Sequence, residues 1–193
     1  MAQRETLNFD NTTAAVRSVF VIVDTAQALA AAETVDLSFT IGAIPAALPG
    51  ETCANAVAVT APATLTTETT VGYVNDIATA TTMGNGCSSF SNGGPDKIYS
   101  VTIPAGQLLT AAVTNVGAAY DTIVYIVAGP TCTATVATCL GSGTDMPGAG
   151  GSETATYRNM GAAPQQVFIV VDFYSATAMP NTGTYSLGVT VTP

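Results

Sequence analysis

Two amino acids are missing from this chain, and both absences narrow its chemistry. Its 193 residues include no histidine and no tryptophan. Without histidine there is no Ser-His or Cys-His nucleophile pair, no imidazole zinc ligand and no imidazole general base. Ser88, Ser89 and Ser175 therefore lack an activating base, and Lys97, the single lysine, stands in no Ser-x-x-Lys motif. The sequence predicts that the protein is not an enzyme.

Charge is also scarce, and what there is carries mostly one sign. Charged residues make up 9% of the chain, with 13 acids against 4 bases and a net charge of −9. Such a surface repels phosphate, which excludes nucleic acid as a partner. The densest apolar run, residues 19–23, is five residues long and ends at Asp24, so it is too short to cross a bilayer. We expect no membrane insertion.

The chain has four cysteines, Cys53, Cys87, Cys132 and Cys139, without any Cys-x-x-Cys spacing. Because no histidine can complete a metal site, disulfides formed in an oxidising compartment are the better interpretation. We favour Cys53 with Cys87, which ties an N-terminal strand to a glycine-rich loop, and Cys132 with Cys139, which flank one short turn. This predicts an exported protein, extracellular or at the cell surface.

The sequence repeats itself. Residues 5–45 align without a gap with residues 153–193, which lie 148 positions further along. Identical pairs at this offset include Glu5 and Glu153, Asn11 and Asn159, Phe20 and Phe168, Asp24 and Asp172, and Pro45 and Pro193. We therefore predict one complete repeat, residues 46–193, preceded by residues 1–45, the C-terminal part of an incomplete repeat.

Strand-forming stretches fill the complete repeat at the spacing of an all-β sandwich or barrel. They are residues 56–60, 65–74, 97–103, 108–115, 122–127, 153–159, 166–172 and 183–192. In KIYSVTI, alternation places Tyr99, Val101 and Ile103 on the core side. The run VFIVVD is apolar on both faces, as in a central strand. The incomplete copy is expected to form three strands, at residues 6–11, 17–24 and 35–41.

These segments resemble a known module, the bacterial pre-peptidase C-terminal (PPC) domain, a small β-sandwich found beside secreted proteases and in large surface proteins. The segments that match, in the family's order, are GGPDKIYSVTIPAGQLLTAAV, GAAYDTIVYIV, Cys132 with Cys139, SETATYRN, VFIVVDFYS and GTYSLGVTV. The resemblance implies an antiparallel, jelly-roll-like β-sandwich. It also implies a non-catalytic extracellular module for adhesion, substrate targeting or surface structure, with a surface polymer or protein among its partners.

Several acids stand near expected strand ends, where loops would bring two of them together as in a glycosidase. These are Asp76, Asp96, Asp121, Asp145, Glu153 and Asp172. We prefer the interpretation that Asp residues in turns cap backbone groups, as Asp121 and Asp172 are placed to do, and that the remaining acids keep the domain soluble. A structural calcium is the further candidate, because hard cations need six or more oxygen ligands. Its candidate ligands are Asn75, Asp76, Asn92 and Asp96. No other cofactor is expected.

Two single side chains have a functional and a structural interpretation. Tyr174 follows the central strand in a loop and is the one aromatic residue expected to contact a ligand, while Tyr99, Tyr157 and Tyr185 fall in strands as core or corner residues. Lys97 is expected to be exposed rather than joined to an Asn or Asp by a side-chain amide.

The incomplete copy suggests an alternative function. Phe20, Val21, Ile22 and Val23 form an apolar strand whose partners are missing from the same copy. The chain would then pair with itself or with neighbouring repeats through β-strands, as a self-assembling subunit of an extracellular filament or pilus-like fibre.

Overall fold

The computed structural model describes residues 7, 9, 17–23, 37–41, 47–75, 77, 87, 94–116, 121–129, 138–141, 143, 150–173 and 184–193. The chain divides into two compact units, Met1–Ala46 and Ala47–Pro193.

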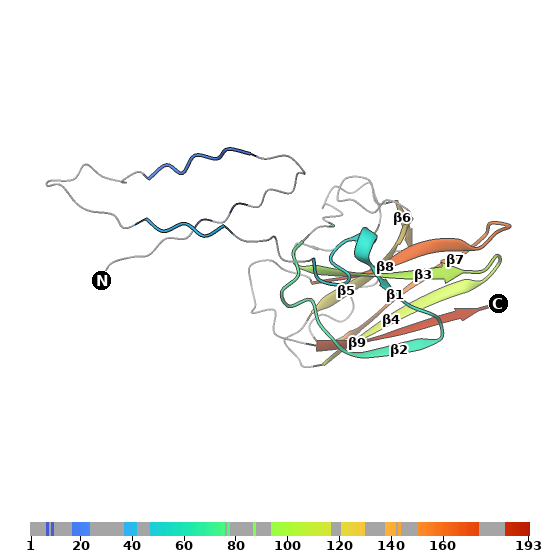
Figure 1. Cartoon of the computed structure of the whole chain (residues 1–193). Coiled ribbons are helices and arrows are strands. Elements are labelled where there is room, and N and C mark those ends of the chain that lie inside the picture. Colours follow the sequence, from blue (N-terminus) through green and yellow to red (C-terminus); the bar gives the residue numbers. More distant parts are fainter. Residues whose placement is uncertain are drawn as a thin grey trace, which may run out of the picture. The chain divides into compact units, whose positions relative to one another are not determined.

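The unit Ala47–Pro193 is a two-layer β-sandwich (Figure 1). Its described residues form a short 3-10 helix, η1 (Cys53–Asn55), and the strands β1 (Val57–Ala58), β2 (Ala63–Glu68), β3 (Asp96–Ile103), β4 (Leu108–Val116), β5 (Thr122–Ala128), β6 (Cys139–Gly141), β7 (Ser152–Arg158), β8 (Gln165–Phe173) and β9 (Thr184–Thr192). One sheet has the order β1-β3-β8-β5-β6 and the other the order β2-β9-β4-β7. The predicted all-β sandwich is confirmed. The pair β1 and β3 is parallel, while the other pairs are antiparallel.

The space between the sheets holds the main core. Tyr99, Val101 and Ile103 of β3 are all buried there, as the alternation predicts. They meet Leu109 and Val113 of β4 and inward residues of the neighbouring strands. Burial of these apolar side chains supplies the main force that holds the two layers together.

The outer face of the five-stranded sheet is buried as well. A second apolar cluster lies on it, containing Ile98 of β3, Tyr125 of β5 and Phe168 of β8, with Ile77 and Cys87 from outside the strands. The strand β8 therefore packs on both faces and lies between β3 and β5. This double burial explains why VFIVVD has no polar face.

Glycine is required where the chain approaches the end of β8. The amide of Gly94 donates to the carbonyl of Phe173 at 2.9 Å, and the amide of Phe173 donates to the carbonyl of Pro95 at 3.2 Å. A Cβ atom added to Gly94 would overlap the backbone carbonyl and the Cβ of Phe173. The Gly-Pro turn thus extends the β3–β8 ladder by a contact that only a residue without a side chain permits.

We expect Gly94→Ala to lower the free energy of unfolding by roughly 1.5 kcal/mol, because backbone must move to admit the methyl group. Urea denaturation followed by tyrosine fluorescence measures the change. The matched control is Gly188→Ala in β9, where the nearest atom, the carbonyl oxygen of Ala112, lies 3.8 Å from the added Cβ. That control is expected to stay within about 0.5 kcal/mol of the wild type. Equal stability of the two variants would contradict the prediction.

The unit Met1–Ala46 is described at residues 7, 9, 17–23 and 37–41. These residues are not assigned to strands, and Figure 1 draws residues 17–23 and 37–41 as trace rather than as arrows. The three strands expected in the incomplete copy remain a prediction, and their other residues lie outside the described part. All the described side chains of this unit are exposed.

Candidate functional site

Two buried carboxyl groups face each other at one end of the five-stranded sheet. Asp96 begins β3, Asp172 is the last but one residue of β8, and the antiparallel register places the two opposite each other. Neither has any exposed surface. Their positions in the strands put them on the outer face, beside the cluster that contains Tyr125. Residues 76 positions apart in the sequence therefore form one local group, which is the candidate site.

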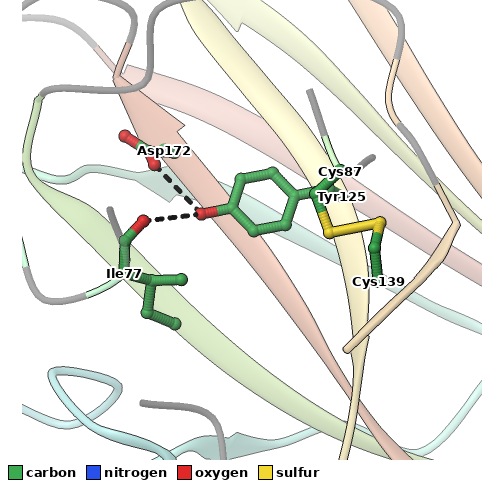
Figure 2. The surroundings of a disulfide bond; sticks show 5 residues. All are labelled: Ile77, Cys87, Tyr125, Cys139 and Asp172. Carbon is green, nitrogen blue, oxygen red and sulfur yellow. Dashed lines mark hydrogen bonds between the residues drawn. A yellow bond between two sulfur atoms is a disulfide. The ribbon is translucent and has the colours of Figure 1, made fainter. Parts of the chain in front are cut away.

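The carboxyl pair holds a piece of covering chain through its backbone. The amide of Ile77 donates to Oδ2 of Asp96 at 2.9 Å. The hydroxyl of Tyr125 lies 3.0 Å from Oδ2 of Asp172 and 3.3 Å from the carbonyl oxygen of Ile77 (Figure 2). Both backbone polar groups of Ile77 are thus paired, and its side chain is buried against the outer face.

Burial determines where the protons of Asp172 and Tyr125 lie. Burial and the neighbouring Asp96 raise the pKa of Asp172 well above its ordinary value, although hydrogen bonds from Tyr125 and from the backbone of Phe173 oppose the rise. A tyrosine hydroxyl carries one proton and can donate to one acceptor at a time. The proton of Tyr125 therefore has two acceptors, Oδ2 of Asp172 and the carbonyl oxygen of Ile77. These contacts join β8, β5 and Ile77 through one hydroxyl group.

A disulfide lies in the same outer cluster as Tyr125. Cys87 is joined to Cys139 of β6, with their Cα atoms 5.1 Å apart and 52 positions between them in the sequence. Figure 2 shows the bridge beside the ring of Tyr125. Cys87 and Tyr125 belong to the same buried cluster, and Cys139 packs against it. The bridge therefore joins Cys87, which lies in the outer cluster, to β6 at the edge of the sheet.

This linkage corrects the pairing favoured from the sequence. Both Cys53 with Cys87 and Cys132 with Cys139 are wrong, since Cys87 and Cys139 are bonded to each other. The short spacing of residues 132 and 139 suggested a local loop, but β6 pairs with β5 and carries Cys139 to the outer face. Cys53 is also disulfide-bonded. Cys132 lies outside the described residues.

The site is closed to substrates. Asp96 and Asp172 are fully buried, so a molecule in solvent cannot contact the two carboxyl groups. The interpretation as caps is confirmed for both, since Asp96 accepts the amide of Ile77 and Asp172 accepts a backbone hydrogen bond from Phe173. Neither is a solvated surface group, because both are buried. The same holds for Glu153, which is buried and accepts the hydroxyl of Thr122 at 2.8 Å.

Two of the four predicted calcium ligands lie among the described residues. Asn75 is exposed whereas Asp96 is buried, and Asp76 and Asn92 lie outside the described part. Within the described part of the chain, no three residues of the types His, Cys, Asp and Glu form a group that could hold a metal ion. The calcium site stays a prediction.

A second polar network lies at the same end of β3, around Lys97. Its ammonium group contacts Oε2 of Glu68 at 2.6 Å, and the same oxygen accepts the hydroxyl of Tyr99 at 2.8 Å. The hydroxyls of Tyr99 and Tyr185 are 2.7 Å apart in the core. Lys97 also lies 5.3 Å from the ring centre of Tyr73. This network links β3 with β2 and β9 of the other sheet.

Lys97 is therefore not the exposed residue that the sequence suggested, since only 13% of its side chain is accessible. Burial lowers the pKa of Lys97. Hydrogen bonds to Glu68 and Tyr73, together with the charges of these two groups, raise the pKa by more than burial lowers it, so the net change is upward. A protonated ammonium group is not a nucleophile, which agrees with an ion pair rather than an amide crosslink.

The remaining predicted residues separate into core, surface and undescribed positions. Tyr99 and Tyr185 are buried in the core, and Tyr157 is partly buried with its hydroxyl on Oε1 of Gln165 at 2.9 Å. Tyr174 and Asp145 lie outside the described residues. Phe20, Val21, Ile22 and Val23 are exposed, with 91% of Phe20 accessible.

A surface groove lies away from the buried acids, along β1 and the end of β3. Its volume is about 390 Å³. Its lining is formed by Ala58, Val59, Thr60, Ala61, Ser100, Val101, Thr102, Pro104, Gln107, Gln166 and Val191. These residues offer hydroxyl, amide and small apolar contacts but no acid, base or aromatic ring.

Sequence reasoning did not find the residues that organise the candidate site. Ile77 and Tyr125 gave no motif, and the pairing of Asp96 with Asp172 depends on strand register. The available signal was that Asp172 interrupts an apolar run and is repeated at Asp24, which marks a polar residue kept at a buried position.

Comparisons with protein-family models, with curated proteins and with solved structures found no match. Among the described residues, no helix has the length and apolar character needed to cross a membrane.

Proposed function

We propose that this chain is a non-catalytic β-sandwich module of an extracellular or cell-surface protein, repeated along the polypeptide to build a surface structure. The observation that carries the proposal is the internal repeat of 148 positions, because self-similarity at a fixed period is the signature of proteins built as arrays. The function of a module that is repeated in this way is structural: its shape and its spacing along the chain build the array.

The chemistry of the sandwich supports the same function. Its disulfides suit an oxidising environment, and the bond between Cys87 and Cys139 of the edge strand β6 resists local opening there. Its buried acids and its lysine are engaged in structural contacts. Adhesion and substrate targeting, which the PPC resemblance suggests, would use the surface of this module, with the uncharged groove as the first place to test.

The test is surface shaving of intact cells that produce the natural protein. An antibody raised against residues 47–193 follows the protein while thiols are alkylated before lysis. We expect to find the antigen in the medium, or to see it disappear from intact cells treated with protease while a cytoplasmic marker stays intact. We also expect that none of its cysteines is alkylated. Antigen that is protected inside the cell and carries alkylated cysteines would refute the proposal. Hydrolytic activity abolished by one acid substitution would refute the non-catalytic part.

A self-assembling filament subunit is the second candidate. It is favoured by the exposure of Phe20 and Ile22, at 91% and 85%, because exposed apolar strands promote association. Light scattering of the intact chain separates the two candidates, since a subunit of this kind forms oligomers whose mass grows with concentration.

A further inference from the structure

The topology of the sandwich shows what the incomplete repeat lacks. Residues 1–45 repeat the stretch that forms β7, β8 and β9. In the sandwich, β7 pairs with β4, β8 lies between β3 and β5, and β9 lies between β2 and β4. These three strands do not pair with one another. A copy of them alone therefore cannot satisfy its backbone hydrogen bonds in this arrangement.

The incomplete copy nevertheless keeps the polar residues that this arrangement buries. Glu153, Asn159 and Asp172 are buried in the sandwich, and the repeat carries the same residue types at positions 5, 11 and 24. Their partners come from the earlier strands. Glu153 accepts from Thr122 of β5, Asn159 donates to the carbonyl of Ile103 of β3, and Asp172 meets Tyr125 of β5. Residues 1–45 thus repeat one partner of each contact, and the other partner belongs to β3 or β5.

The apolar pattern agrees. On β9 the residues Tyr185, Leu187 and Val189 are fully buried. At the corresponding positions, the incomplete copy has Leu37, Phe39 and Ile41, which are 53%, 67% and 99% exposed. On β8, Phe168 is 4% exposed while its counterpart Phe20 is 91% exposed. Corresponding apolar side chains are thus covered in one copy and uncovered in the other.

We propose that residues 1–45 form β7, β8 and β9 of a second sandwich, whose other strands come from a segment of the β1–β6 type other than residues 46–148 of the same copy. Addition to an exposed sheet edge does not fit, because the counterpart of β8 needs a strand on each side and is apolar on both faces. The inference does not depend on what the module is for.

Stoichiometry argues against a second copy of this chain as the partner. Each copy carries one β1–β6 set and two β7–β9 sets, counting residues 1–45. Exchange among identical copies therefore always leaves half of the β7–β9 sets without partners. A segment that carries only β1–β6 has the complementary composition.

The test supplies the missing strands by fusion. Residues 46–148 are placed ahead of Met1 of the full chain, which reproduces the period of 148, and the protein is folded under oxidising conditions. Trypsin cleavage after Arg17 is the readout, because Arg17 is exposed in the present chain and corresponds to Gln165, the first residue of β8. We expect cleavage at Arg17 to be at least about tenfold slower in the fusion than in the original chain, since proteolysis needs local opening.

Two substitutions that each add one negative charge serve as matched variants of the fusion. Val21→Asp corresponds to Ile169, which is fully buried, and should restore fast cleavage at Arg17. Asn8→Asp corresponds to the exposed Thr156 and should leave Arg17 protected. Cleavage at the same rate in the fusion and the original chain would overturn the proposal. So would concentration-dependent protection of Arg17 in the original chain, which would identify a second copy as the partner.

Discussion

Replacing Cys87 and Cys139 together by alanine is expected to lower the free energy of unfolding by about 4 kcal/mol. The bond closes a loop of 52 positions, and a crosslink of this length removes about that much conformational entropy from the unfolded chain. The loss adds to a local effect, because the bridge packs beside Tyr125 in the outer cluster. Guanidinium denaturation of the oxidised proteins measures the difference.

The control for this variant is Thr138→Ala, next to Cys139. Its side chain is exposed and its carbonyl still accepts the amide of Ala128, so we expect a change below about 0.5 kcal/mol. Peptide mapping of the wild-type protein checks the linkage itself. Recovery of a Cys53–Cys87 or a Cys132–Cys139 peptide would contradict the structure, as would a double variant as stable as the control.

The parts of this fold that sequence predicts are those with a short-range pattern. Alternation in KIYSVTI identified Tyr99, Val101 and Ile103 as core, because side chains in a strand alternate between faces. The continuous apolar run of β8 identified a central strand, and the second cluster on the outer face supplies the reason. The three-residue strand β6 carries no such periodicity and was missed.

The parts that sequence did not predict depend on which strands become neighbours. Cys139 lies near Cys132 in the sequence, but pairing of β6 with β5 decides its true partner. Lys97 looks like a strand-flanking surface residue until β2 brings Glu68 to it from another sheet. Asp96 and Asp172 look like separate capping residues until the register of β3 and β8 places them opposite each other.

The buried acid pair predicts how stability depends on pH. The pKa of Asp172 is raised by burial and by the neighbouring Asp96, so it is higher in the folded than in the unfolded chain. The groups that shift it include no cation. Its stabilising contribution is therefore present while the carboxyl group is protonated, below the ordinary aspartate value of about 4, and is lost as the pH rises through the folded pKa.

We expect Asp172→Asn to remove this dependence, because the amide keeps the shape and an acceptor for Tyr125 but carries no charge. Near pH 4 the variant and the wild type should differ by less than about 1 kcal/mol, whereas at pH 9 the variant should be more stable by on the order of 2 to 3 kcal/mol, the size of a buried charge without an opposite charge. Urea denaturation at several pH values measures the difference, in which the other titrating groups cancel.

Asp96→Asn keeps an acceptor for the amide of Ile77 while removing the neighbouring charge, so it should give a smaller change of the same sign. Wild-type and Asp172→Asn stability curves that run parallel from pH 4 to pH 9 would show that Asp172 does not hold its proton in the folded protein.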